Sequence, residues 1–231
     1  MCGRYSIAAA DPAVLRARFG LGEAVVVERR FNVAPTDGVL AVIGGDPPHG
    51  EILRWGLVPH WAEDLSIGVR AINARAETVA SKPLFRESFA TRRCLVIADG
   101  FYEWKRLESR KQPWHITLAG GEPFAFAGLW ASWQGLTGET VRSAAIITTT
   151  ASPRIAPIHD RMPVILPRAA EATWLDPAAG SDELQDLLVP LPDALTAARP
   201  VSTAVNDARY DGPACLEDPV EPAPPQAPRL F

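Results

Sequence analysis

The sequence predicts an α+β fold in which mainly antiparallel strands curl into a barrel-like sheet with helices at its periphery. Strand-like segments follow one another along the chain, whereas a parallel, doubly wound sheet needs alternating strands and helices. The 231 residues are 47% hydrophobic and 22% charged, an ordinary composition for a globular protein with one sizeable core. We therefore expect a single domain over residues 1–210.

Helical signals lie near the start of the chain and in its last third. Asp11 is a suitable N-cap and Pro12 a suitable first residue for a short helix that runs to about Phe19 and stops at Gly20. Residues 167–188 have the apolar spacing of two amphipathic helices.

Most of the remaining chain is strand-like. The expected strands are Gly38–Ile43, a segment that starts at Glu51, Cys94–Ala98, Trp114–Leu118, Pro123–Ala131 and Ser143–Thr149. Gly120-Gly121 is a turn signal, which predicts a hairpin between the strands on either side of it. From Gly212 onward the sequence is rich in proline, and we expect residues 211–231 to form a disordered tail.

Several classes of protein are not indicated. The chain has no signal-peptide pattern, and no apolar run reaches the ~18 residues needed to span a bilayer, so we expect a cytoplasmic protein without membrane contact. The three cysteines, Cys2, Cys94 and Cys215, form no CxxC pair and no even framework. We therefore expect reduced thiols and no structural zinc site.

The charge is unevenly distributed, although the net charge is −4. Residues 1–111 hold 16 Lys and Arg against 13 Asp and Glu, whereas residues 112–231 hold 7 against 14. A basic excess in one part of a chain is a hint of polyanion binding, and a solvated surface explains it equally well.

The first residues, Met1-Cys2-Gly3-Arg4-Tyr5, carry the most specific chemistry in the sequence. Removal of Met1 would leave Cys2 with an α-amine and a thiol two carbons apart. Such a 1,2-aminothiol condenses with an aldehyde to an imine, and the thiol then closes a stable thiazolidine ring. Both groups titrate near neutrality, at roughly 8 for the amine and about 8.5 for the thiol. The alternative is a cysteine placed by chance in a fraying terminus.

Two further segments contain candidates for acid-base chemistry. Glu103 lies within the aromatic run Phe101-Tyr102-Glu103-Trp104, and apolar surroundings raise the pKa of a glutamate towards neutrality. His159 lies in His159-Asp160-Arg161-Met162-Pro163, a polar turn that is poor core material.

Aromatic and basic residues supply candidates for contacts to nucleic acid. Trp61 follows a proline in polar surroundings and is suited to base stacking or to the core, whereas Trp55 is expected in the core. Lys82 and Arg86 belong to a basic segment that also suits an exposed, salt-bridged helix.

Six motifs in order resemble the SRAP family (SOS response-associated peptidase), whose members shield abasic sites in single-stranded DNA. They are Met1–Tyr5, Phe31-Asn32-Val33-Ala34-Pro35, Arg54-Trp55-Gly56-Leu57-Val58-Pro59, Asn73-Ala74-Arg75-Ala76-Glu77-Thr78, Gly100-Phe101-Tyr102-Glu103-Trp104 and His159–Pro163. The resemblance extends to about residue 208. It implies the same α+β fold and leaves the proline-rich tail outside the family's pattern.

The resemblance also implies roles for individual residues. Cys2 is expected to be the nucleophile, Asn73 a positioning group, and Glu103 and His159 the proton-transfer residues. The implied DNA contacts are Arg4, Arg75 and Arg161 to phosphates, Trp61 and Trp104 near the flanking bases, and Arg86 and Asn32. His60 stands where the family more often has a small polar residue.

The implied function is to sense and shield abasic sites in single-stranded DNA through a covalent thiazolidine at Cys2. The resemblance leaves open strand nicking by an abasic-site lyase activity and self-cleavage of Met1. We expect no metal, no cofactor and a monomer, located in the cytoplasm and on the nucleoid when bound to DNA.

Three other functions are compatible with parts of the sequence. Met-Cys-Gly also begins class II glutamine amidotransferases, although 231 residues leave little room for their second domain. A cysteine peptidase with Cys2, His159 and Glu103 as a triad is a second alternative. A binding module for single-stranded DNA that forms no covalent product is the third.

Overall fold

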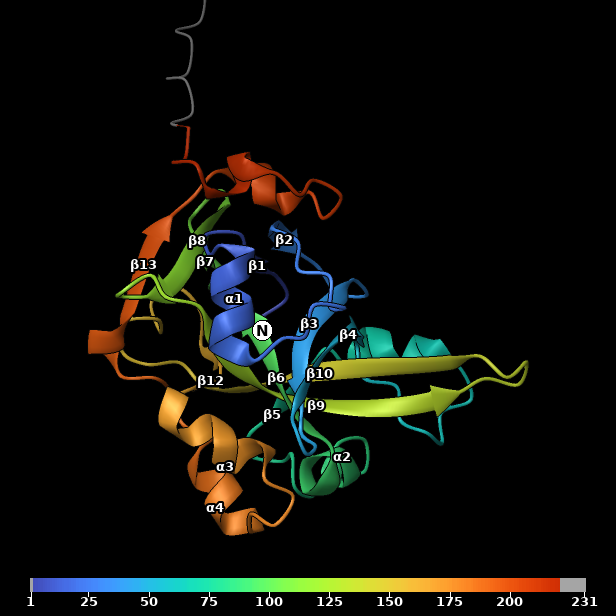
Figure 1. Ribbon diagram of the computed structural model, residues 1–231. Helices are drawn as coiled ribbons and strands as arrows, with labels where there is room; N and C mark the ends of the chain where they lie inside the picture. The colour runs from blue at the N-terminus through green and yellow to red at the C-terminus, as the bar shows by residue number, and fades with distance from the viewer. Residues whose placement is uncertain (1, 221–231) are drawn as a thin grey trace, which may run out of the picture.

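The computed structural model of the chain describes residues 2–220, which fold into two β-sheets that share one core (Figure 1). The smaller sheet is antiparallel throughout its described pairs. Its strands are, in spatial order, β13 (Thr196–Pro200), β8 (Lys111–Leu118), β7 (Gly100–Arg106), β1 (Tyr5–Ile7) and β2 (Arg30–Val33).

The larger sheet curls into a barrel. Its strands are, in spatial order, β11 (Arg161–Pro163), β10 (Thr140–Thr150), β4 (His49–Trp55), β3 (Gly38–Ile43), β6 (Arg93–Ala98), β9 (Phe124–Gln134) and β12 (Ile165–Leu166), with β5 (Asn73–Arg75) beside β10. Because β9 also pairs with β10, the path β10-β4-β3-β6-β9 closes on itself. Among the described pairs only β10–β4 and β10–β5 are parallel. The predicted α+β fold with a mainly antiparallel, barrel-like sheet is confirmed.

The helices are short and peripheral. They are α1 (Pro12–Phe19), α2 (Arg86–Thr91), α3 (Glu171–Leu175) and α4 (Ser181–Asp186), with 3-10 turns η1 (Leu65–Arg70), η2 (Arg168–Ala170), η3 (Asp193–Leu195), η4 (Thr203–Asn206) and η5 (Pro213–Leu216). The predicted caps of α1 are present, since the Asp11 side chain accepts from the Ala13 amide and Gly20 has a left-handed φ of 63°. No helix in the described part of the chain is long and apolar enough to cross a membrane.

Strand β1 holds the start of the chain inside the molecule. The Tyr5 ring packs edge-on against Trp55 and Phe126, with ring centroids 5.4 and 5.8 Å away. Trp55, predicted to be core, is fully buried. The residues just before Tyr5 are therefore held in place, because the backbone of Tyr5 pairs within the smaller sheet while its ring packs against the larger sheet.

The predicted hairpin around Gly120-Gly121 is wrong. The turn forms, with the Gly121 amide donating to the Leu118 carbonyl and a φ of 74° at Gly121, but β8 and β9 belong to different sheets. Strand β9 is buried along most of its length and pairs with β6 and β10. Local turn chemistry predicted the reversal, whereas the partner of β9 is set by burial against distant strands.

The packed part of the chain extends beyond the predicted boundary at residue 210. Cys215 in η5 is fully buried, and the Asp211 carboxylate accepts hydrogen bonds from the Phe31 and Asn32 amides of β2. Figure 1 places this segment beside β8 and β2, opposite α3 and α4. Of the expected tail, residues 221–231 lie outside the described residues.

Candidate active site

Cys2 is fully buried, three residues before the start of β1. Strand β1 pairs with β7, and the Tyr102 amide of β7 donates to the Arg4 carbonyl at 3.0 Å. The Cys2 Sγ atom lies 3.8 Å from the same carbonyl. Burial, and secondarily the negative charge of Glu103, raise the pKa of the Cys2 thiol, so the thiol stays protonated at neutral pH.

Asn73 connects Cys2 to the larger sheet. It is the first residue of β5, which runs parallel to β10 and pairs with it at Ile146. Its Nδ2 atom donates a 2.7 Å hydrogen bond to the Cys2 carbonyl oxygen. The Oδ1 atom of Asn73 is buried and has no hydrogen-bond partner among the described residues. An acceptor is thus held next to the cysteine, as a positioning role requires.

Glu103 and His159 come together from β7 and from the turn before β11. The His159 Nε2 and Glu103 Oε2 atoms are 3.9 Å apart. On the other edge of the ring, Nδ1 lies 3.0 Å from the Arg161 amide nitrogen and 3.1 Å from Asp160 Oδ1, which fixes the ring's orientation. Nε2 is thereby directed towards the glutamate.

Burial tunes this pair for proton transfer. Desolvation raises the pKa of Glu103 to about 7, because the carboxylate is only 2% exposed. Partial burial lowers the pKa of His159 below its ordinary value. Near neutral pH, Glu103 therefore exists in both protonation states while the imidazole is largely neutral. The sequence-based prediction that the aromatic surroundings of Glu103 raise its pKa agrees with this shift.

An open pocket of about 450 Å³ lies against the pair, lined by Glu103, Trp104, Lys111, His159 and Asn206. The Trp104 Nε1 atom donates to Asn206 Oδ1 at 2.7 Å. Lys111 and Asn206 were not among the predicted site residues. Lys111 pairs with Arg106 in the β7–β8 hairpin, and this local pairing could have indicated that the lysine lies near the site. Asn206 gives no such local signal, because it is 102 residues away from Trp104 in the sequence.

The predicted phosphate contacts have different surroundings. Arg75 is exposed and lies two residues after Asn73 on β5, so both side chains leave the same face of the strand. Arg161 forms a bidentate ion pair with Glu77, at 2.5 and 3.0 Å, and donates to the Thr148 carbonyl. This pairing lowers the pKa of Glu77. Arg86 is exposed at the first turn of α2.

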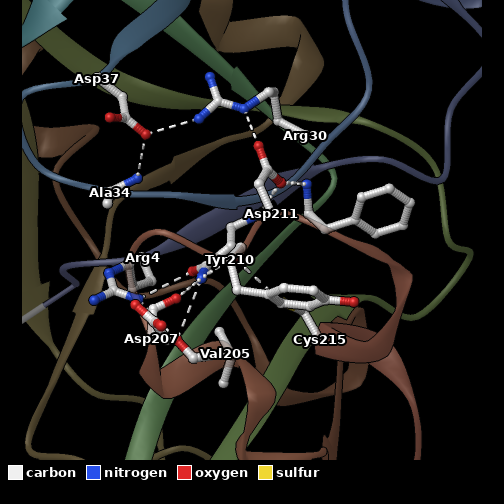
Figure 2. A network of polar contacts seen from close by, with 11 residues as sticks. Arg4, Arg30, Ala34, Asp37, Val205, Asp207, Tyr210, Asp211 and Cys215 are labelled. Atoms are coloured by element: carbon white, nitrogen blue, oxygen red, sulfur yellow. Dashed lines mark hydrogen bonds and ion pairs between the residues drawn. The ribbon is translucent and has the colours of Figure 1, made fainter.

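Arg4 and Asn32 belong to a network that binds residues 205–210. Figure 2 shows Arg4 next to Val205, Asp207 and Tyr210 of that segment. Arg4 Nη1 donates to Asn32 Oδ1 at 3.1 Å and to the Val205 carbonyl at 2.8 Å. The Asn32 Nδ2 atom lies within 3.3 Å of the carbonyls of Val205, Asp207 and Tyr210. Asn32 is fully buried in this network, and its predicted contact to DNA stays a prediction. The side-chain amide of Asn32 orients Arg4 and holds residues 205–210 in place.

The two predicted stacking residues both reach solvent. Trp61 is 51% exposed beyond Pro59, and the neighbouring Ala62 carbonyl accepts from Trp133 Nε1, which anchors this loop to β9. Trp104 is partly exposed at the edge of the pocket. His60 lies 3.3 Å from Glu87 and contacts none of the catalytic candidates in the described ion pairs.

The residues brought together at Cys2 can supply a nucleophile, a hydrogen-bonding amide and two proton-transfer groups. They come from four separate parts of the chain: the residues before β1, β5, β7 and the turn before β11. No group of three or more His, Cys, Asp or Glu side chains within residues 2–220 is arranged to hold a metal ion.

Comparison with known proteins identifies relatives in sequence and one solved structure with a similar fold. Abasic site processing protein YoaM from Bacillus subtilis is 42% identical over 226 residues, which cover 94% of this chain and 98% of that protein. Abasic site processing protein HMCES from Xenopus tropicalis is 35% identical over 71% of this chain and 56% of its own length. A crystal structure of a protein from Bacteroides thetaiotaomicron superposes with a TM-score of 0.86 at 26% identity and covers 94% of this chain and 99% of that one.

The sequence profile of one family spans nearly the whole packed region. It is described as SOS response associated peptidase (SRAP), and it matches residues 1–208. The chain therefore belongs to the SRAP family.

Proposed function

We propose that this protein recognises abasic sites in single-stranded DNA and shields them by forming a covalent thiazolidine through Cys2 once Met1 is removed. The observation that carries the proposal is the 2.7 Å hydrogen bond from Asn73 to the Cys2 carbonyl, which holds the backbone of the cysteine in place. The Glu103 carboxylate lies 3.9 Å from His159, and its charge acts on the Cys2 thiol. The names of the relatives refer to abasic site processing and support DNA as the partner.

The chemistry begins with the sugar. An abasic deoxyribose is mostly a closed hemiacetal, so a base must remove the C1′ hydroxyl proton while an acid protonates the ring oxygen. The free aldehyde then accepts the Cys2 amine to give a carbinolamine, which loses water to form an imine. Glu103, with a pKa of about 7, can accept and return protons in each step. His159 is the second proton carrier.

Ring closure uses the thiol. The Cys2 sulfur adds to the imine carbon, a C–S bond forms, and the thiol proton passes to the nitrogen. The overall change is loss of one water. Since the charge of Glu103 contributes to the raised pKa of the thiol, protonation of Glu103 by the amine makes the thiol more acidic when it is needed. The Asn73 Oδ1 atom is an acceptor for the amine or a sugar hydroxyl.

The raised thiol pKa disfavours the peptidase alternative. A catalytic cysteine in a peptidase triad needs a thiol pKa well below its ordinary value, usually through an adjacent imidazolium. Burial shifts Cys2 in the other direction. The exposed Arg75 and the partly exposed Trp104 support binding of phosphates and bases outside the reacting sugar.

The test is incubation of the pure protein with a single-stranded oligonucleotide that carries one abasic site, followed by a denaturing gel. The proposal predicts a heat-stable protein–DNA band that is absent with an intact oligonucleotide and weaker with a duplex. No such band would reject it, and hydrolysis of glutamine by the same sample would favour the amidotransferase alternative.

A further inference from the structure

One wall of the open pocket takes no part in the covalent steps above. Trp104, Lys111 and Asn206 line it, and they come from β7, β8 and η4. The contact that connects them is the 2.7 Å hydrogen bond from the Trp104 indole to Asn206 Oδ1. Asn206 itself is exposed, so this bond is made at the surface of the pocket.

The hydrogen bond determines how the indole lies. An indole has one polar atom, its Nε1–H, which only donates. A partly exposed ring without a partner for this atom can rotate, whereas the bond to Asn206 holds one orientation. The Trp104 ring also packs against a buried cluster that contains Tyr102, Val201 and Val205, and this contact further restricts its orientation. The exposed part of Trp104 is thereby a pre-organised aromatic surface.

The same bond orients the rest of the asparagine. Because Oδ1 accepts from Trp104, the Nδ2 amine of Asn206 is directed away from the indole and offers two donors. Lys111 adds a cation to the same wall. An aromatic surface next to hydrogen-bond donors and a positive charge matches a nucleotide, which presents a flat base, acceptor atoms and a phosphate.

The proposed function already places Trp104 near a base that flanks the reacting sugar. We propose that Asn206 is the positioning residue that fixes the orientation of Trp104 for this contact, and that Lys111 supplies the cation for the same nucleotide. This subsite rests on the proposed function, since it takes a neighbour of the reacting sugar. Asn206 touches the reacting atoms in no step.

A purely structural role for Asn206 would predict a different outcome. The segment that carries it has other attachments, including the Val201 amide to the Pro113 carbonyl at 3.0 Å and the Ser202 amide to the Glu217 carbonyl at 2.8 Å. Loss of the Asn206 side chain should therefore leave η4 in place. Any loss of DNA affinity in an Asn206 variant should then depend on the base next to the abasic site and should not reflect unfolding.

The experiment is a thermodynamic cycle that combines substitutions in the protein with removal of a flanking base from the DNA. Binding is measured to single-stranded oligonucleotides that carry an unreactive tetrahydrofuran in place of the abasic sugar, with the base on its 5′ or 3′ side present or removed. Asn206→Leu, Trp104→Phe and the double variant are compared with wild type. Ser202→Ala is the matched control, because Ser202 caps η4 through the Ala204 amide but does not contact Trp104.

We expect Asn206→Leu to weaken binding about 3- to 10-fold when one particular flanking base is present and to have no effect when that base is absent. Trp104→Phe keeps the ring and loses the donor, so it should give a similar loss, and the double variant no more than either single one. Ser202→Ala should show no dependence on the base.

Equal weakening with and without the base, or none in either case, would overturn the inference. These outcomes are separate from those of the crosslinking proposal, because the tetrahydrofuran cannot react. A wild-type protein whose binding depends on the flanking base but which forms no covalent product would support the subsite and reject the crosslink.

Discussion

The side-chain amide of Asn73 donates a 2.7 Å hydrogen bond to the carbonyl oxygen of Cys2, and this bond ties the start of the chain to a strand 71 residues away. It fixes the backbone from which both the amine and the thiol of the proposed nucleophile project. Without it, Cys2 would keep its burial in the core and the pairing of β1 with β2 and β7, but its backbone would lose this contact to β5.

Asn73→Leu should slow crosslinking by roughly tenfold or more, because the reacting groups lose their fixed approach to the aldehyde. Affinity for an oligonucleotide with a tetrahydrofuran site should change little, since the phosphate contacts remain. Single-turnover rates and equilibrium binding measured on the same preparation separate the two. A loss of affinity equal to the loss of rate would assign Asn73 to DNA binding instead.

Glu103 should destabilise the protein at alkaline pH. Its folded pKa of about 7 is raised above the unfolded value, so its contribution to stability is present at low pH and is lost as the pH rises through 7. Glu103→Gln should therefore stabilise the protein more at pH 8 than at pH 5. The gain in the free energy of unfolding at pH 8 should be up to about 3 kcal/mol, and it is measured as a rise in melting temperature. It should also slow crosslinking by roughly 10²-fold.

Glu77 provides the matched control for that experiment. The ion pair with Arg161 lowers its pKa, so its contribution is present at neutral pH and is lost as the pH falls. Glu77→Gln should show the opposite dependence on pH from Glu103→Gln. The same trend in both variants would mean that the burial of Glu103 does not control its titration.

Arg75 should contribute one phosphate contact. Arg75→Ala should weaken binding to single-stranded DNA and reduce the salt dependence by roughly 0.7 in the slope of log affinity against log salt. Arg168→Ala removes an exposed charge in η2, outside the site, and should leave this slope unchanged. An identical slope for wild type and Arg75→Ala would exclude Arg75 from the DNA path.

Truncation should locate the end of the packed domain. A chain that stops after residue 210 loses Asp211, which caps β2, and the buried Cys215, so its melting temperature should fall by several degrees or more. A chain that stops after residue 220 keeps both and should melt like the full-length protein. Thermal denaturation of the two truncated chains tests this directly, and equal stability of both would restore the predicted boundary at 210.

The sequence predicted those parts of the site that local chemistry defines. Cys2 was recognisable from its position, and Glu103 from the aromatic residues beside it. The fold class followed from consecutive strands. These inferences need only neighbouring residues or a small number of ordered motifs.

What the sequence did not predict depends on contacts between distant segments. Asn206 accepts a hydrogen bond from Trp104, which lies 102 residues earlier in the sequence. Asn32 donates to backbone carbonyls that lie more than 170 residues later. The partner of β9 was likewise missed, because a turn signal specifies a reversal but not the sheet that the next strand joins. Tertiary packing between distant segments decides all three.

The central claim is that the amine and the thiol of Cys2 both bond to the abasic sugar, and the mass of the adduct tests it most directly. Intact-mass spectrometry should find the protein without Met1 plus the oligonucleotide minus one water, stable to heat without borohydride. Cys2→Ala, or one residue added before Cys2, should abolish this species while the fold is retained. A heat-stable adduct of the same kind from either variant would contradict the thiazolidine mechanism.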